Sequence, residues 1–318
     1  MTPTTIVPEP VRELASGLWF PEGPVALTDG TMLVVEIGAG TVTAIAPDGS
    51  TRPLASVGGG PNGAAVGPDR AVYVANNGGF LWTERAGRRI PIDPATHTNE
   101  PPGFAGGWIE RIDLDTGAVT ILYRECDGRP LRGPNDLVFD ADGGMWFTDH
   151  GKGRHDSVDR GGLFYAAADG SRIAQVAYPL LGPNGVGLSP AGDRVYVAET
   201  HTGRIWEWEL TAPGVVRPVA ASLGIRHGGR CLAATPYSFD SLAVEASGNI
   251  VVGALGDGLC VVSPDGEVEE LVAFAGDVTT NLCFRGPTLE KAVVTLSGSG
   301  RVVEIDWPRP GLDLAFNA

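Results

Sequence analysis

Six polar residues recur at equivalent places along the chain, and their types suggest a shared chemistry. Each stands near the start of a short apolar segment, and together they are Glu22, Asn62, Asn135, Asn184, Asp240 and Asn281. Asn and Asp often begin turns, so any one of them alone is a common structural choice. A set of buried carboxylates and amides without partners would be costly. Ca²⁺ binds carboxylate and amide oxygens together with water, so the set predicts a hard divalent cation rather than a zinc site built from His and Cys.

The segments around these residues predict the elements that position them. In most units a turn rich in Asp and Gly follows the apolar segment, then a β-rich run, a third strand and a fourth. Hairpins require this alternation of short strands and turn residues. The second strands are expected at 32–36, 72–76, 145–149, 195–199, 250–254 and 292–296. Four strands in each of six units predict an all-β fold, a six-bladed β-propeller.

The two ends of the chain predict how the ring closes. Prolines follow the third strand of the sixth unit, at Pro308 and Pro310, and disfavour a regular fourth strand there. The segment Val11-Arg-Glu-Leu-Ala-Ser resembles the fourth strand Val268-Glu-Glu-Leu-Val-Ala of the fifth unit. We therefore expect the N-terminal strand to complete the last blade and residues 1–318 to form a single propeller domain.

Unequal spacing predicts which mouth of the channel is functional. The six residues are separated by 40, 73, 49, 56 and 41 positions. The extra residues of the longer units are assigned to 77–107, 151–160 and 225–237. Each of these segments is expected on the face where the inner strands begin. Long loops on a rigid scaffold commonly carry function. The first insert is interpreted as a lid that contains Trp82, Arg85, Arg88, Arg89, His97 and Phe104.

The ends of the second strands return to the same mouth and supply further candidates: Glu36, Asn76, Asn77, Asp149, His150, Glu199 and His201. Among these and the inner set, Asn62, Asn77, His150 and His201 are the predicted substrate-binding residues. The two histidines are suited to orienting a substrate or moving a proton, and the alternative is an ordinary loop histidine bonded to solvent or backbone.

Composition excludes several classes of protein. Gly 46 and Pro 25 among 318 residues interrupt long helices, and Lys+Arg 23 against Asp+Glu 38 gives a net charge of −15. Binding of such an acidic chain to nucleic acid or to anionic lipid is disfavoured by charge repulsion. The four cysteines form no CxxC motif, and the N-terminus carries no signal-peptide pattern. A cytoplasmic protein is expected, as a monomer or small homo-oligomer.

The sequence resembles the SMP-30/gluconolactonase/LRE family, which is related to the paraoxonases and to diisopropylfluorophosphatase. The resemblance rests on Glu22-Gly-Pro, on Gly133-Pro-Asn-Asp with Trp146-Phe-Thr-Asp, on Gly182-Pro-Asn-Gly with Val195-Tyr-Val-Ala-Glu-Thr, and on Asp240. It implies a six-bladed propeller with one catalytic divalent ion, Ca²⁺ first and Zn²⁺, Mn²⁺ or Mg²⁺ as alternatives. The residues at the metal would be Glu22, Asn135, Asn184 and Asp240, although the residue at Asn135 is not a direct ligand in some members.

The same resemblance implies a metal-dependent lactonase whose partner is a small-molecule lactone. The ion would polarise the lactone carbonyl, and Asp240 would act as the general base toward water. A direct nucleophilic role of Asp240 remains open from the sequence. Gly133 stands where sugar lactonases of the family often carry Arg, so a sugar lactone is not specified. The alternatives are cleavage of phosphotriesters or phosphofluoridates at the same metal, and a non-catalytic propeller that binds other proteins.

Overall fold

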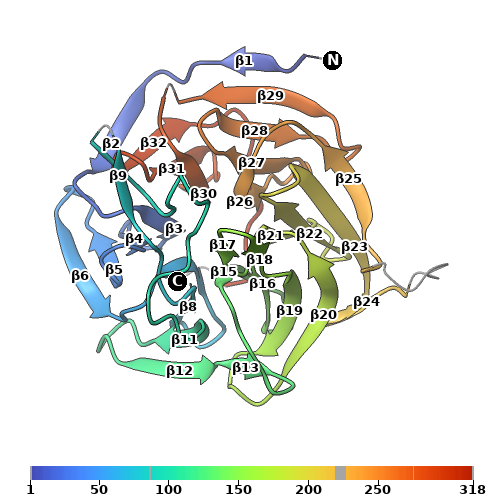
Figure 1. Cartoon of the computed structure of the whole chain (residues 1–318). Coiled ribbons are helices and arrows are strands. Elements are labelled where there is room, and N and C mark those ends of the chain that lie inside the picture. Colours follow the sequence, from blue (N-terminus) through green and yellow to red (C-terminus); the bar gives the residue numbers. More distant parts are fainter. Residues whose placement is uncertain (1, 86, 219–226, 275, 317–318) are drawn as a thin grey trace.

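The computed structural model describes residues 2–85, 87–218, 227–274 and 276–316, and it contains six β-sheets arranged around a central channel (Figure 1). Four antiparallel strands form each blade, with the first strand nearest the axis and the fourth strand toward the rim. The described part of the chain contains no helix, and therefore none long and apolar enough to cross a membrane. The predicted six-bladed propeller is confirmed.

Blades one to three take their strands in chain order. The first contains β3 (Pro21–Ala26), β4 (Met32–Glu36), β5 (Thr41–Ile45) and β6 (Thr51–Ser56). The second contains β7 (Pro61–Val66), β8 (Val72–Asn76), β11 (Trp108–Ile112) and β12 (Val119–Tyr123). The third contains β15 (Pro134–Phe139), β16 (Gly144–Asp149), β19 (Gly161–Ala167) and β20 (Ile173–Leu180).

Blades four to six complete the ring. The fourth contains β21 (Pro183–Leu188), β22 (Arg194–Glu199), β23 (Arg204–Ala212) and β25 (Arg230–Ala234), with β24 (Val215–Val216) paired to the end of β23. The fifth contains β26 (Phe239–Val244), β27 (Ile250–Ala254), β28 (Gly258–Val262) and β29 (Val268–Ala273). The sixth contains β30 (Thr279–Arg285), β31 (Lys291–Leu296), β32 (Arg301–Asp306) and β2 (Val11–Ala15).

Short hairpins extend from the blades. They are β9 (Thr83–Arg85) with β10 (Arg88–Ile90), β13 (Glu125–Cys126) with β14 (Arg129–Pro130), and β17 (Gly153–Arg154) with β18 (Ser157–Val158). The first and the last of these lie inside the two predicted mouth inserts, 77–107 and 151–160. Both hairpins therefore add structure on the face where the inner strands begin.

The N-terminal segment closes the ring as predicted. Strand β2 pairs antiparallel with β32, with Val11 opposite Ile305 and Arg12 opposite Glu304. An additional strand, β1 (Thr4–Ile6), pairs parallel with the outer edge of β29 in the fifth blade. Residues 4–15 thus join two neighbouring blades and cover an edge that would otherwise remain unpaired.

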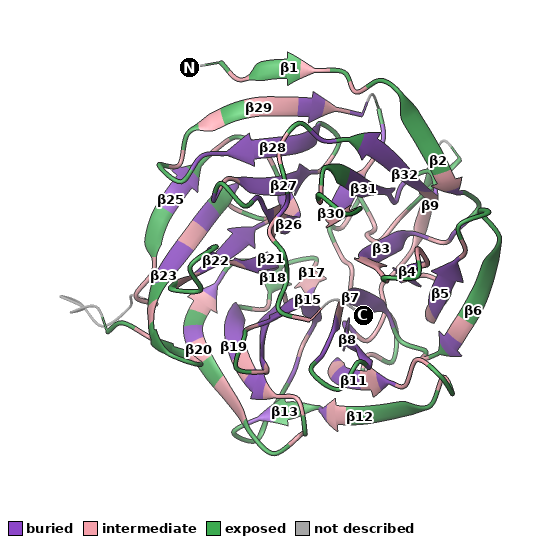
Figure 2. Cartoon of the chain, turned by 180° about the vertical axis from the view of Figure 1, so that it is seen from behind, coloured by how far each residue is buried: buried purple, intermediate pink, exposed green. Residues whose placement is uncertain are grey.

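Burial follows the position of a strand within its blade. In Figure 2 the second and third strands are mostly purple, whereas outer strands such as β6 and β12 are largely green. These second and third strands carry Val, Ile and Ala on both faces because neighbouring blades cover both faces. Trp208 is buried in the cluster that joins the third and fourth blades, and the partly exposed Trp206 packs against this cluster.

One predicted insert is wrong in its position. The extra residues of the fourth unit were assigned to 225–237, before the next inner strand, but this range includes the outer strand β25. The long connection runs instead between β23 and β25, which joins third and fourth strands on the face opposite the mouth. Residues 225 and 226 lie outside the described part. A short outer strand inside an irregular stretch gave too little periodic signal to be recognised.

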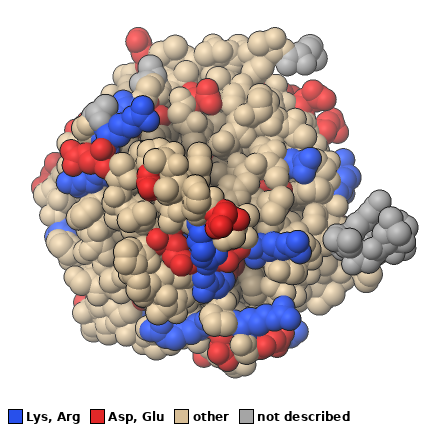
Figure 3. All heavy atoms as spheres, in the orientation of Figure 1, with Lys and Arg blue, Asp and Glu red and all other residues tan. Residues whose placement is uncertain are grey.

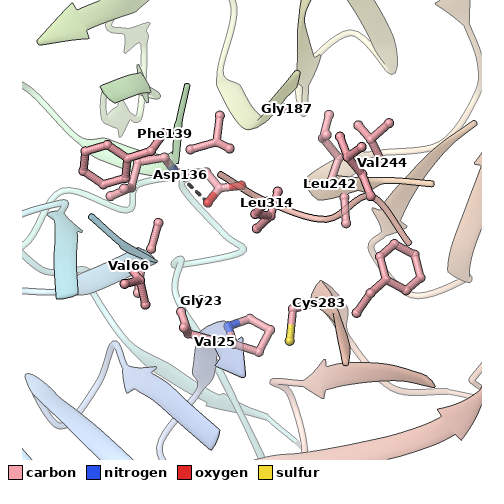
Figure 4. A pocket seen from close by; sticks show the side chains of 18 of the residues that line it. Gly23, Val25, Val66, Asp136, Phe139, Gly187, Leu242, Val244, Cys283 and Leu314 are labelled. Carbon is pink, nitrogen blue, oxygen red and sulfur yellow. Dashed lines mark hydrogen bonds between the residues drawn. The ribbon is translucent and has the colours of Figure 1, made fainter. Parts of the chain in front are cut away.

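The C-terminal segment crosses the channel on that opposite face. Residues Leu312, Leu314, Ala315 and Phe316 line a cavity of about 120 Å³ together with residues of all six inner strands, which reach from Asp136 and Asn281 near the strand starts to Phe139 and Phe284 near their far ends. The close-up in Figure 4 shows its apolar walls, including Val66, Phe139 and Leu242, with the carboxylate of Asp136 as the labelled acid. The far half of the channel is therefore apolar, and the C-terminal segment covers it.

Candidate active site

The predicted inner residues lie at a shared irregularity of the fold. In all six blades the pairing of the first two strands shifts register at the start of the inner strand, for example between Glu22 and Val25 or between Pro183 and Val186. Such a bulge redirects side chains relative to the regular pleat. The residues of this inner ring, all at or beside a shift and five of them buried, are Glu22, Asn62, Asn135, Asn184, Asp240 and Asn281.

Glycines allow the inner strands to approach closely at this level. A Cβ atom on Gly23 would lie 2.8 Å from the Ala64 nitrogen, and one on Gly63 would lie 2.6 Å from the Asn135 carbonyl oxygen. A Cβ on Gly185 would lie 2.5 Å from the nitrogen of Leu242. Each glycine follows an inner-ring residue, so the inner-ring side chains of neighbouring blades are brought together in a narrow channel.

The carboxyl groups of Glu22, Asp136 and Asp240 lie close enough in this channel to interact electrostatically. Burial raises the pKa of Glu22 to about 7 and raises the pKa of Asp240 well above its ordinary value, with the Glu22 charge adding to the second shift. Burial and the charge of Glu22 likewise raise the pKa of Asp136 to about 8. Asp136 was not singled out from the sequence, because it lies one residue past the recurring position and only the bulge brings it to the others.

The amides of the inner ring are partnered unequally. Asn281 Nδ2 donates to Glu22 Oε2 at 2.7 Å, and Asn184 Nδ2 donates to Thr200 Oγ1 at 3.1 Å. Asn135 Oδ1 is buried and has no hydrogen-bond partner. An orphaned buried oxygen beside mutually repelling carboxylates is a site that a cation would satisfy.

The donor chemistry fits a hard divalent ion. Among the described residues no group of three or more His, Cys, Asp or Glu side chains is arranged to hold a metal ion. Oxygens of Glu22, Asp240, Asn135 and Asn184 instead form a mixed carboxylate and amide set, the type that calcium accepts. We therefore treat these four residues as the candidate metal site.

Four of the candidates at the ends of the second strands hold the loops that enter the inner strands. Their side chains accept backbone N–H groups of the loops that lead into the inner strands: Glu36 from Trp19 (2.8 Å), Asn76 from Gly60 (2.8 Å), Asp149 from Gly133 (2.6 Å) and Glu199 from Leu181 (2.7 Å). These four residues, here called the outer ring, repeat one device in four blades. Their hydrogen bonds hold the loops that present the inner ring.

The two predicted histidines form a pair. The rings of His150 and His201 are 5.1 Å apart in an edge-to-face arrangement, and both lie against Gly182, two residues before Asn184. Burial and the neighbouring His201 lower the pKa of His150 to about 3, and burial lowers the pKa of His201. Both imidazoles are thus neutral near pH 7 and can exchange hydrogen bonds without carrying charge.

The predicted lid is anchored at both ends. Trp82 packs against Phe20 and Trp19, with ring centroids 5.4 and 6.0 Å apart, and Arg89 stacks 4.5 Å above Trp19. At the other end, Glu100 bonds to Arg132 and Arg154. Figure 3 shows acidic and basic side chains side by side near the middle of this face, over the position of β17 and β18. Trp82 is thus an anchor of the insert to the first blade.

The family follows from comparison with known proteins. The model for the SMP-30/gluconolactonase/LRE-like region matches residues 20–298. The chain belongs to this family. A gluconolactonase from Zymomonas mobilis is 27% identical over 329 aligned positions, which cover 94% of this chain and 82% of that protein. The diisopropyl-fluorophosphatase of Loligo vulgaris is 24% identical over 217 positions, 63% of this chain and 65% of that protein.

A solved structure supports the fold of this family member. The calcium-binding protein regucalcin from Agrobacterium tumefaciens superposes with a TM-score of 0.72 at 17% identity, covering 99% of this chain and 100% of that one. This likeness confirms the propeller, and the family-model match over residues 20–298 confirms the resemblance read from the short motifs.

Proposed function

We propose that this SMP-30/gluconolactonase-like protein is a metal-dependent lactonase. The observation that carries the proposal is the inner ring, where buried carboxyl groups repel one another and the oxygen of Asn135 lacks a partner. Similarity to the gluconolactonase of Zymomonas mobilis supports the lactone as substrate class.

The proposed residues at the ion are Glu22, Asn135, Asn184 and Asp240, with Ca²⁺ as the first candidate. When bound, a divalent ion supplies positive charge that polarises the ester carbonyl and stabilises the oxyanion. With an ion held there, the Asp240 carboxyl would be ionised at neutral pH in spite of its burial.

Asp240 is the proposed general base. Its carboxylate accepts a proton from water as the water oxygen bonds to the carbonyl carbon. The ring C–O bond then breaks, and the departing alkoxide takes up a proton to give the open hydroxy acid. Direct attack by Asp240 would instead form an acyl intermediate that water cleaves, and incorporation of ¹⁸O from labelled water into the Asp240 carboxylate in a single turnover distinguishes the two routes. Asn62, Asn77, His150 and His201 remain the proposed substrate contacts.

A metal-stripping experiment tests the function. The protein is treated with a chelator, assayed by pH-stat on a panel of γ- and δ-lactones, and assayed again after addition of Ca²⁺, Mn²⁺ or Zn²⁺. We expect acid release that disappears with the chelator and returns with the ion. Acid release that the chelator leaves unchanged would contradict metal dependence, and none from any lactone would contradict the lactonase.

A second candidate is hydrolysis of phosphotriesters or phosphofluoridates, which similarity to the squid enzyme supports. The same metal-loaded preparation is assayed on a phosphotriester. Turnover of that substrate without turnover of any lactone would favour this alternative.

A further inference from the structure

A lysine is buried at the functional mouth. Lys152 is only 1% exposed, although it lies in the insert that follows β16. Its Nζ donates to the carbonyl oxygen of Gly79 at 2.7 Å and to Asn77 Oδ1 at 3.2 Å. The ring of Phe80 lies 4.0 Å from the same nitrogen, and that of Phe104 lies 5.2 Å away. A buried lysine with specific acceptors is rare, so its position calls for an explanation.

The charges around Lys152 do not form a simple ion pair with it. Asp149, Glu100 and Asp159 favour its charged form and Arg132 opposes it, yet burial dominates and lowers the pKa of Lys152 to about 7. These acids are engaged elsewhere, because Asp149 accepts backbone N–H groups and the other two bond to arginines. The specific hydrogen bonds of the amine therefore go to the segment Asn77–Gly79.

Those bonds fix the orientation of the Asn77 amide. Asn77 Oδ1 accepts from Lys152 Nζ and also from the Gly79 nitrogen at 2.8 Å. A flipped amide would place Nδ2 against two donors, so this orientation is the only one that forms both bonds. Asn77 Nδ2 is left buried and without any hydrogen-bond partner. A buried donor without an acceptor is costly, and a ligand oxygen would relieve that cost.

Asn77 lies between two residues of the inner ring. Its backbone N–H donates to the carbonyl of Gly60, two residues before Asn62. On its other side is Gly107, where an added Cβ would lie 3.3 Å from the Asn77 carbonyl carbon and 2.4 Å from Pro134, the residue before Asn135. Asn77 thus lies between the segments that lead to Asn62 and to Asn135, and Asn135 belongs to the candidate metal site.

We propose that Asn77 Nδ2 donates a hydrogen bond to an oxygen of the substrate, and that Lys152 is the positioning residue that holds the amide in this orientation. The proposal rests on the proposed lactonase function and adds a specificity determinant to it. A site built to donate to a substrate oxygen discriminates against analogues that lack it. Ring-hydroxylated lactones are therefore expected to be preferred over unsubstituted ones of the same ring size.

A double-mutant cycle tests the coupling. The variants are Lys152→Met, Asn77→Asp and the combination, each loaded with the ion that supports activity, and Lys291→Met serves as the matched control because Lys291 is the other lysine of the chain. Each single change is expected to lower kcat/KM for a hydroxylated lactone by about tenfold or more. The double variant is expected to lose no more than the Asn77 variant, because Lys152 acts through Asn77. Additive losses would overturn the proposal, and so would full activity of either single variant.

A second measurement is independent of turnover. The ¹⁵N side-chain amide signals of Asn77 are assigned by their absence in Asn77→Asp and are followed in Lys152→Met. We expect them to shift or broaden in that variant and to remain unchanged in Lys291→Met. Unchanged signals in Lys152→Met would overturn the positioning role. Failure of the wild type on every lactone would instead overturn the lactonase function and leave this measurement valid.

Discussion

Two rings of polar residues surround the mouth of this propeller, and they differ in how far their hydrogen bonds are satisfied. The outer ring at the ends of the second strands accepts N–H groups from the entering loops. Asp149 alone accepts three N–H groups, two from the entering loop (Arg132 and Gly133) and one from Gly151. The inner ring is equally buried, but its carboxyl groups repel one another and Asn135 Oδ1 has no partner.

The difference separates structure from chemistry. Satisfied polar groups stabilise the fold, whereas unsatisfied ones lower stability unless a ligand completes them. The far half of the channel gives a further contrast, since its walls are apolar and its end is covered by the C-terminal segment. The unpartnered oxygen of Asn135 and the unpartnered Nδ2 of Asn77 lie instead on the mouth side.

The largest expected effect is on the inner ring. Asp240→Asn should lower kcat for lactone hydrolysis by at least about 1000-fold, because the proposed base and a metal ligand are lost together. In the metal-free protein its Tm should stay equal or rise, since one of three repelling carboxyls is removed. Initial rates by pH-stat and thermal melts measure both effects. Retained activity would remove Asp240 from the base role.

The outer ring should respond in the opposite way. Asp149→Ala leaves the N–H groups of Arg132, Gly133 and Gly151 without their acceptor. We expect a loss of about 3 kcal/mol in the free energy of unfolding, measured with urea. The matched change Asn135→Ala removes an unpartnered oxygen and should cost less. Equal losses in the two variants would contradict the distinction between the rings.

The pH dependence of stability tests the role of Glu110, which bonds to Asn76 of the outer ring. Glu110 accepts hydrogen bonds from Asn76 and Trp108, and burial raises its pKa to about 7 from an ordinary value of 4.5. Because Glu110 binds its proton more tightly in the folded state than in the unfolded state, it stabilises the fold fully below about pH 4.5. This contribution is lost as the pH rises toward 7. The difference in the free energy of unfolding between the wild type and Glu110→Gln should change by on the order of 2 kcal/mol between pH 4.5 and 7.5.

The exposed Glu13 is the control for that series. Its bond to Arg301 lowers its pKa, so its contribution is present at neutral pH and is lost on acidification. A wild-type protein whose stability relative to Glu110→Gln does not vary between pH 4.5 and 7.5 would contradict a buried, raised carboxyl at position 110.

The smallest expected effect concerns the lid. Trp82→Ala removes aromatic contacts to Trp19 and Phe20, which precede Glu22. We expect a loss of about 1 kcal/mol in stability and a severalfold increase in KM, with kcat nearly unchanged. Steady-state kinetics at saturating metal measure this. A change in kcat as large as that of Asp240→Asn would show that the lid belongs to the catalytic groups.

Much of the architecture could be predicted because it depends on short, local stretches of the sequence. The repeated order of apolar segment, turn and β-rich run identified the six blades, and the likeness of 11–16 to 268–273 predicted the closing strand. The placement of the fourth unit's extra residues was wrong, since the short strand β25 carries little periodic signal. Asp136 and Lys152 were also missed, because each reaches the mouth only through contacts with other blades.

The sequence by itself determined the blade repeat, the family and the positions of the inner ring, since residue type and spacing along one strand are local properties. Only the tertiary structure decided which polar groups have partners. The sequence placed Glu36, Asn76, Asp149 and Glu199 at the mouth without a role, and the structure shows that they accept backbone N–H groups. Hydrogen-bond satisfaction depends on atoms brought together from distant parts of the chain, and no spacing along a single strand encodes it.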